Sequence, residues 1–300
     1  MKNFFKRLFP TSSKRPDSAT SNAATAPLDE EQVWDLLGTK TASRFSHLIS
    51  GSALDPGHRR DNNEDAVLCL NAALGGADAL PFGLYAVADG MGGHRNGELA
   101  SEMAVRALGS YLMGKLYRPL FGPDPQPAQE SLQELMEAAV QEAHRAVRKA
   151  APGGGCTLTA ALVVGGQMAI AHLGDSRAYA GYRDGRIEAL TKDHSLVKRL
   201  QEMGQITEEE AAIHPQKSVL YRALGQGATI QADVFTSPLP TQGFLMICSD
   251  GLWGVLPEDD IQRIVNSTSS PYLACQHLVE AANAAGGPDN ISVVLVRAVS

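Results

Sequence analysis

The sequence predicts an α+β fold, and two kinds of pattern carry that prediction. Short apolar runs are joined by turns at Gly165-Gly166 and at Asp184-Gly185, the usual sign of β-hairpins and hence of antiparallel sheet. Two longer segments instead repeat their apolar residues every three to four positions, as amphipathic helices do. Since a helix with one apolar face must cover another element, we expect helical layers packed on the sheets.

Continuous apolar runs, as found in buried strands, recur along the chain. The runs on either side of Gly165-Gly166 form the first hairpin, and a segment that turns at Asp184-Gly185 forms the second. The predicted strand segments are, in order, FGLYAVAD (82–89), CTLTAALVV (156–164), QMAIAHLGD (167–175), RAYAGYRDGRIEALT (177–191), GFLMICSD (243–250) and ISVVLVRA (291–298).

Two helices are predicted between these strands. In the first, Ala100, Leu108 and Leu112 belong to a stripe that follows the i, i+3, i+4 spacing. The second begins with SLQE, in which Ser131 and Glu134 form a capping box, and its apolar residues again lie on one face.

The chain divides unevenly into a tail, residues 1–42, and a single globular domain, residues 43–300. Residues 11–27 form a Ser/Thr/Ala/Pro tract without periodicity, which predicts a flexible tether. Residues 28–38, LDEEQVWDLLG, could add a short helix. The domain contains no internal repeat.

Composition excludes several classes. A chain of 300 residues that is 44% hydrophobic can bury one large core or two modest ones. A net charge of −7 disfavours a nucleic-acid surface. The cysteines stand singly, which indicates a reducing compartment and disfavours a zinc ribbon or a disulfide scaffold. There is no apolar run of the roughly 18 to 20 residues that span a bilayer, and the basic start lacks a signal-peptide core. We therefore expect a monomeric, cytoplasmic protein without a transmembrane segment.

Four aspartates lie at the margins of predicted strands: Asp89, Asp175 and Asp250 end apolar runs, and Asp289 precedes one. Each alone could be an ordinary turn residue, as we expect of Asp184. Asp89 and Asp250, however, are not followed at once by a returning strand. Since four acids at strand margins repel one another unless a cation lies among them, the set predicts a bound metal.

The ligand type favours Mg²⁺ or Mn²⁺, because zinc and copper usually take His or Cys. The glycines after Asp89 fit this prediction. Gly90 lets the backbone come close to a cation and offer its carbonyl oxygen, and Gly92 and Gly93 leave room for a substrate.

A further polar group lies in HRRDNNEDAV (58–67), a segment that is too polar to belong to the core. A solvated turn with an incidental ion pair is the simpler interpretation. If the segment folds next to Asp89, the Arg60 guanidinium offers a planar fork to phosphate oxygens. Glu64 and Asp65 could then accept hydrogen bonds from metal-bound waters.

Seven motifs in a fixed order give the chain a resemblance. RRDNNEDA, ADGMGGHRNGELAS, GDSRAY, LTKDHSLV, RALG, CSDGLW and GGPDNISVVLV resemble the metal-dependent protein serine/threonine phosphatases of type 2C, in their bacterial form. The match runs from about Gly51 to the C-terminus. It implies a β-sandwich of two mainly antiparallel sheets flanked by paired helices, in α-β-β-α layers, with two Mn²⁺ or Mg²⁺ ions in a cleft at one end.

The resemblance also implies roles for particular residues. Asp89 bridges the two ions, the Gly90 carbonyl binds one of them, and Asp250 and Asp289 complete the other. Arg60 corresponds to the phosphate-binding arginine, and Glu64 and Asp65 correspond to the acids around the metal waters. Asp175 corresponds to a ligand of a third, weaker metal site. The stretch from His194 to about Arg222 corresponds to a mobile flap beside the cleft.

The implied reaction is hydrolysis of phosphoserine and phosphothreonine in proteins, the substrates of a Ser/Thr kinase, by a water shared between two metal ions. Two alternatives stay open, a phosphoprotein-sensing pseudophosphatase and another dinuclear metal hydrolase such as a nuclease. Two departures limit the carry-over. Met91 replaces the His of some relatives, a candidate general acid, and Gly254 replaces a common Asp, so the third ion should be held weakly.

Overall fold

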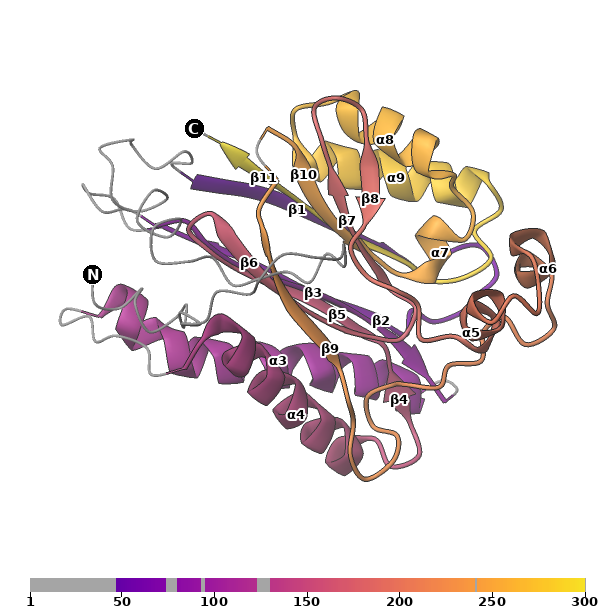
Figure 1. The fold of residues 1–300 in the computed structure, drawn as a ribbon, viewed down its shortest axis with the longest axis horizontal. Helices are drawn as coiled ribbons and strands as arrows, with labels where there is room; N and C mark the ends of the chain where they lie inside the picture. The colour runs from indigo at the N-terminus through magenta and orange to yellow at the C-terminus, as the bar shows by residue number, and fades with distance from the viewer. Residues whose placement is uncertain (1–46, 74–79, 93–94, 123–129, 241, 300) are drawn as a thin grey trace, which may run out of the picture.

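A computed structural model describes residues 47–73, 80–92, 95–122, 130–240 and 242–299. The predicted tail (1–42), its short helix (28–38) and Gly93 lie outside the described residues. Two sheets pack face to face, and each is covered on its outer face by helices (Figure 1). The predicted α+β class and the α-β-β-α layers are confirmed.

Antiparallel pairing connects the strands of both sheets. One sheet has the order β1-β11-β10-β7-β8, and the other has the order β2-β3-β5-β6-β9, with β4 paired to β3. The strands of the first are β1 (His47–Asp55), β7 (Arg177–Gly181), β8 (Ile187–Ala189), β10 (Phe244–Cys248) and β11 (Ile291–Val299). Those of the second are β2 (Asp65–Ala72), β3 (Phe82–Met91), β4 (Gly155–Cys156), β5 (Leu158–Val164), β6 (Gln167–Leu173) and β9 (Asp233–Pro238).

Both predicted hairpins form. β5 and β6 are joined at Gly165, whose φ of 65° is in the left-handed region that favours glycine. β7 and β8 are joined around Gly185, with a φ of 90°. The apolar runs become strands because the two inner faces share one core, formed in part by Tyr85, Ile170 and Val294.

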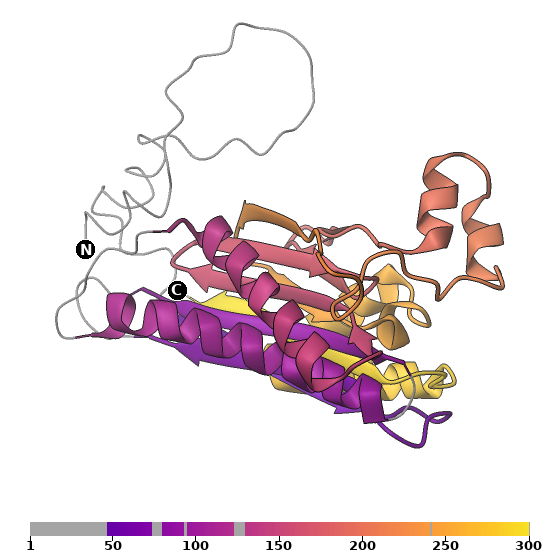
Figure 2. The ribbon, with the colours of Figure 1, turned by 90° about the horizontal axis from the view of Figure 1, so that it is seen from below.

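Helices pair on each outer face. α3 (Arg95–Phe121) and α4 (Leu132–Ala150) cover the sheet that contains β3. The predicted capping box at Ser131 and Glu134 starts α4. The other sheet is covered by helices that the sequence pattern did not predict, α7 (Asp250–Trp253), α8 (Glu258–Asn266) and α9 (Pro271–Ala284). The short helices α5 (Leu196–Glu202) and α6 (Glu208–Ala212) project beyond the sheets (Figure 2).

The strand register brings the predicted acids to one end of the sandwich. Asp65, the first residue of β2, is opposite Asp89 of β3. At the same end of the other sheet, Cys248 of β10 is paired with Val293 of β11, so Asp250 and Asp289 lie just beyond that pair. The topology therefore gathers residues that are far apart in the sequence.

Candidate metal and phosphate site

Asp89 lies inside β3 and not at its end, which corrects the prediction. The strand continues through Gly90 and Met91 because these residues pair with Cys156 and Gly155 of β4. Both backbone polar groups of Asp89 are hydrogen-bonded to Thr157, whose Oγ1 accepts from the Asp89 N–H at 2.9 Å and whose N–H donates to the Asp89 carbonyl at 2.8 Å. The side chain of Asp89 is thus held on a rigid strand.

Gly90 is required by close packing of backbone segments. A Cβ at this position would lie 2.3 Å from the carbonyl oxygen of Gly97 and 2.6 Å from that of Glu64. The Gly90 N–H donates to the Glu64 carbonyl at 3.1 Å. Any side chain at position 90 would therefore collide with neighbouring backbone.

Asp65 is buried, although its segment had been predicted to be too polar for the core. Its Oδ2 accepts hydrogen bonds from Ser249 Oγ at 2.8 Å and Ser292 Oγ at 2.5 Å. Ser249 follows β10 of the opposite sheet, and Ser292 lies in β11 of that sheet. Its Oδ1 is buried without a hydrogen-bond partner. The two hydroxyl donors reduce the free-energy cost of burying this carboxyl group. They leave its other oxygen, Oδ1, available to a bound group.

Asp250 begins α7, directly after Ser249, and its Oδ1 is also buried without a partner. Asp289 precedes β11. Its Oδ1 accepts from the N–H of Asn290 at 2.9 Å, and its Oδ2 accepts from Arg60 Nη2 at 2.7 Å. Arg60 therefore does fold beside the acids, and the hydrogen bond with Asp289 raises its pKa.

Asn290 holds the loop that carries Arg60. Its side-chain amide donates to the carbonyl oxygens of Pro56 and Asn62, both at 2.9 Å, and its Oδ1 accepts from the Glu64 N–H at 2.8 Å. Sequence reasoning missed the roles of this residue and of the two serines that hold Asp65. These residues are adjacent to a predicted acid or belong to a predicted strand. Their roles become visible only in the tertiary structure, which brings them to the distant residues that they hydrogen-bond.

Asp175 is buried in the turn after β6. Its carbonyl oxygen accepts a hydrogen bond from Trp253 Nε1 at 2.9 Å. Burial and the nearby charge of Asp250 raise its pKa to about 8. The carboxyl group of Asp175 therefore lies within electrostatic range of Asp250. That Asp175 binds a metal ion stays a prediction.

The acids affect one another strongly. Burial, opposed by the serine hydrogen bonds and reinforced by neighbouring carboxylates, raises the pKa of Asp65 to about 7. Burial and Asp289 raise the pKa of Asp250 to about 6. Burial and four neighbouring carboxylates raise the pKa of Asp89 well above its ordinary range. Such repulsion is relieved by a cation, and oxygen donors fit Mg²⁺ or Mn²⁺.

Three observations bear on whether these residues fit such a cation. The buried oxygens Asp65 Oδ1 and Asp250 Oδ1 lack hydrogen-bond partners. Within the described ranges, however, no three His, Cys, Asp or Glu side chains converge on a single point as a finished metal cage does. Asp289 is instead held by Arg60. The oxygen donors are of the type that such a cation prefers, but Asp289 Oδ2 would have to leave Arg60 in order to bind one.

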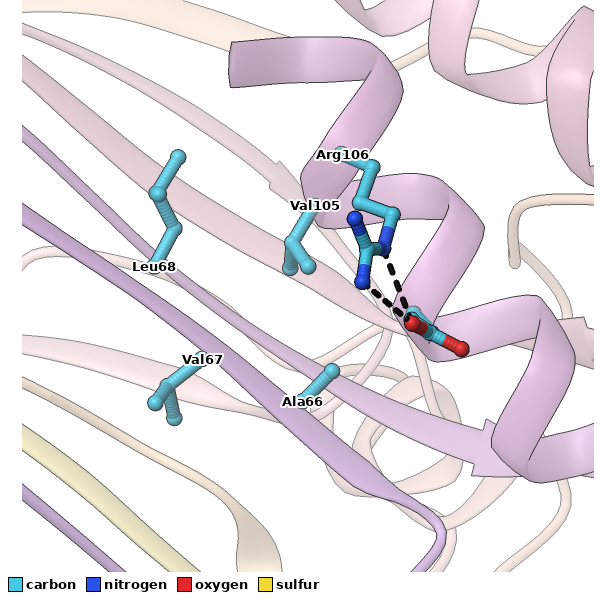
Figure 3. A pocket seen from close by; sticks show the side chains of 6 residues that line it. Ala66, Val67, Leu68, Val105 and Arg106 are labelled. Carbon is cyan, nitrogen blue, oxygen red and sulfur yellow. Dashed lines mark hydrogen bonds and ion pairs between the residues drawn. The ribbon is translucent and has the colours of Figure 1, made fainter.

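A shallow pocket of about 240 Å³ lies between β2 and α3 (Figure 3). None of the predicted site residues lines it, and its one ion pair joins Arg106 to Glu102 on α3. The lining residues are Ala66, Val67, Leu68, Glu102, Val105 and Arg106. The acids at the end of the sandwich are therefore the better candidate for chemistry.

Comparison with known proteins identifies the family. Residues 58–284 match the family model described as protein phosphatase 2C. The chain belongs to the protein phosphatase 2C family. It is therefore a protein phosphatase, a hydrolase of phosphoproteins that depends on a divalent metal. In the described part of this phosphatase, no helix is long and apolar enough to cross a membrane.

Relatives of this phosphatase match most of their own length. The serine/threonine phosphatase stp of Listeria innocua is 37% identical over 249 residues, which is 81% of this chain and 93% of that protein. A serine/threonine phosphatase structure from S. agalactiae is 34% identical with a TM-score of 0.71, over 84% of this chain and 100% of that one. The catalytic domain of PstP, solved in complex with two manganese ions, is 31% identical with a TM-score of 0.67, over 84% and 99%.

Proposed function

We propose that this phosphatase hydrolyses phosphoserine and phosphothreonine in proteins that a Ser/Thr kinase has modified, at a site for two Mn²⁺ or Mg²⁺ ions. The observation that carries the proposal is the gathering of Asp89, Asp250 and Asp289 at one end of the sandwich, with Arg60 hydrogen-bonded to Asp289 at 2.7 Å. Acids that could hold cations and a guanidinium that could hold phosphate thus meet at one place.

Asp89 is the residue that would contact both ions, with the Gly90 carbonyl serving one of them and Asp250 and Asp289 the other. Asp175, together with Asp250, would hold a third ion more weakly, because Gly254 offers no side-chain oxygen. When bound, the ions supply a water of lowered pKa and positive charge for the phosphoryl oxygens.

The chain's own residues bind and orient the substrate. Arg60, whose side chain is 56% exposed, can turn its guanidinium from Asp289 to two phosphate oxygens. Asp65 Oδ2 is fixed by Ser249 and Ser292, so its Oδ1 is the oxygen able to accept a hydrogen bond from the attacking water. Glu64 is placed beside this group by the hydrogen bond between its N–H and Asn290.

The test compares Asp89→Asn and Asp250→Asn with Asp184→Asn, whose carboxylate lies at the tip of the β7–β8 hairpin and pairs with Arg186. With Mn²⁺ and a phosphothreonine peptide, the first two variants should lose turnover and the third should keep it. Near-normal turnover by folded Asp250→Asn would overturn the proposal.

A second experiment measures metal binding, through the melting temperature, and not turnover. Mn²⁺ should raise the melting temperature of the wild type but not of Asp250→Asn. Without metal, Asp250→Asn should melt higher than the wild type, because one of several repelling buried carboxylates has been neutralised. Mn²⁺ binding without hydrolysis of any phosphate ester would indicate a phosphoprotein sensor. Hydrolysis of a phosphodiester but not of the peptide would indicate another dinuclear hydrolase.

A further inference from the structure

The flap segment, residues 194–222, is attached to the body of the protein by two adjacent ends. The Leu196 N–H donates to the Val219 carbonyl at 2.8 Å, and the Tyr221 N–H donates to the His194 carbonyl at 3.0 Å. These bonds make a short antiparallel stem, beyond which α5 and α6 project from the sheets (Figure 2). The orientation of the projecting part therefore depends on what fixes the stem.

Asp233 fixes both ends of the stem from outside the flap segment. It is the first residue of β9 and is paired with His172 of β6. Its Oδ2 accepts from His194 Nε2 at 3.0 Å, and its Oδ1 accepts from Arg222 Nη1 at 2.9 Å. One carboxylate on a sheet strand thus binds the first and the last residue of the segment.

The tautomer of His194 follows from its other contact. The Gly174 N–H donates to His194 Nδ1 at 3.2 Å, so Nδ1 carries no proton and Nε2 carries the proton donated to Asp233. Arg222 Nη1 lies 3.2 Å from the same Nε2, and both groups are donors directed at Asp233. The side chain of His194 is only 3% exposed, so it has little room to change conformation at this end of the flap segment.

His194 also connects the flap segment to the predicted metal site. Its own N–H donates to the Gly174 carbonyl at 2.7 Å, which makes the contact with Gly174 reciprocal. Gly174 precedes Asp175. At the other end, Leu224 exchanges backbone hydrogen bonds with Cys156, and Cys156 is paired with Gly90. At its first residue, the flap segment is thus hydrogen-bonded to the residue that precedes the predicted ligand Asp175. Two residues beyond its last residue, the chain is hydrogen-bonded to the strand partner of the predicted ligand Gly90.

We propose that Asp233 is a positioning residue of this phosphatase: it clamps His194 and Arg222 together and so orients the flap segment toward the Asp175 turn. Because α5 and α6 project beyond the sheets near α7, the helix that begins with Asp250 (Figure 1), a protein bound at the proposed site would be large enough to contact them, whereas a small phosphate ester would not. The clamp therefore contributes to turnover of phosphoproteins. This consequence rests on the proposed function, but the clamp itself does not.

The clamp is tested first on the metal-free full-length chain by limited digestion with trypsin, with cuts after Lys198, Arg199 and Lys217 identified by mass spectrometry. Asp233→Ala should speed these cuts about tenfold, because it removes two charge-assisted hydrogen bonds that oppose local opening. The matched control is Asp260→Ala, which removes an exposed carboxylate 2.7 Å from Arg263 and should leave the cuts unchanged.

Arg222→Met provides a second variant on a partly exposed residue if Asp233→Ala folds poorly. Since both variants break the same clamp, adding Arg222→Met to Asp233→Ala should speed the cuts by less than the product of the two single effects. Cutting rates within twofold of the wild type in both variants would overturn the proposal, whatever the enzyme hydrolyses.

The second test separates the two substrate sizes. With Mn²⁺, Asp233→Ala should raise the KM for a phosphoprotein while kcat/KM for p-nitrophenyl phosphate stays near the wild-type value. Equal losses on both substrates would show that Asp233 supports only the general fold, and would overturn the positioning role. If the wild type hydrolyses neither substrate, the proposed function fails and the digestion result still decides the clamp.

Discussion

Trp253 Nε1 donates a 2.9 Å hydrogen bond to the carbonyl oxygen of Asp175. The Arg177 guanidinium lies 3.5 Å from the centroid of the same indole ring and pairs with Asp193 at 2.8 Å. Trp253 is the last residue of α7, the helix that Asp250 begins. The indole thus connects the two acids that the proposed third metal ion would share.

Replacing Trp253 with Phe should loosen this connection. The variant keeps an aromatic ring for Arg177 and removes the donor to the Asp175 carbonyl. Loss of one such bond costs about 1 kcal/mol, which lowers the melting temperature of a domain of this size by about 2–4 °C. The Mn²⁺ concentration for half-maximal activity should also rise. Tyr272→Phe, at a residue that is 56% exposed, is the control; a Trp253→Phe variant that behaves like it would contradict this role.

Two glycines should respond to alanine in opposite directions. At Gly90 a Cβ would lie 2.3 Å and 2.6 Å from two backbone carbonyl oxygens, so Gly90→Ala must displace β3 or its neighbours and should lower both stability and activity. At Gly114, inside α3, a Cβ would meet nothing within 4 Å. Gly114→Ala should therefore stabilise the protein by about 0.5–1 kcal/mol. Urea unfolding measures both, and equal effects would contradict the packing described for Gly90.

Gly254 allows a test of the third ion. A Cβ there would lie 2.7 Å from the Asp250 carbonyl oxygen, so any substitution must shift the end of α7. Gly254→Asp should therefore be compared with Gly254→Ala, which shares the Cβ but not the carboxylate. If a third ion binds beside Asp175, the Asp variant should reach half-maximal activity at a lower Mn²⁺ concentration than the Ala variant, and calorimetry should detect tighter binding at one more site. Superimposable curves would leave Asp175 with a structural role only.

His172 should make stability depend on pH. Its Nε2 lies 3.0 Å from the Lys192 carbonyl and its Nδ1 lies 2.9 Å from Thr159 Oγ1. Burial and the neighbouring His194 lower its pKa to about 4. The unfolded chain, with a pKa of about 6.5, takes up the proton first, so stability present above that pH is lost as pH falls toward 4. The loss amounts to at most about 3 kcal/mol.

The measurement is the free energy of unfolding between pH 7 and pH 4. Relative to the wild type, His172→Gln should make the free energy of unfolding fall less, or rise more, as the pH decreases to 4, whatever its effect at neutral pH. The buried carboxylates with raised pKa act in the opposite direction and are common to both proteins. His277→Gln, at an exposed position on α9, should leave the slope unchanged. A His172→Gln variant with the wild-type slope would mean that another group sets the acid dependence.

Local sequence pattern predicted much of the fold. Apolar runs predicted β3, β5, β6, β10 and β11 because strands buried on both faces show no polar alternation. The turns at Gly165 and Gly185 predicted two hairpins, and SLQE predicted the start of α4. β1, β2 and β9 were missed. In β1, Gly51 interrupts the apolar pattern, and no side chain fits there because the backbone of Tyr272 lies against it. β2 begins with the polar Asp65, which does not resemble the start of a buried strand.

Local sequence pattern also predicted only part of the candidate site. The sequence predicted a role for the acids, Arg60 and the glycines, because their residue types and order are visible along the chain. Only the tertiary structure decided that Asp65 is buried, since Ser249 and Ser292 lie 184 and 227 residues away in sequence. It likewise decided that Asn290 holds the Arg60 loop and that Asp233 clamps both ends of the flap segment. Periodicity and turn chemistry act over a few residues, whereas a buried carboxylate is stabilised by donors that meet it only when the two sheets pack.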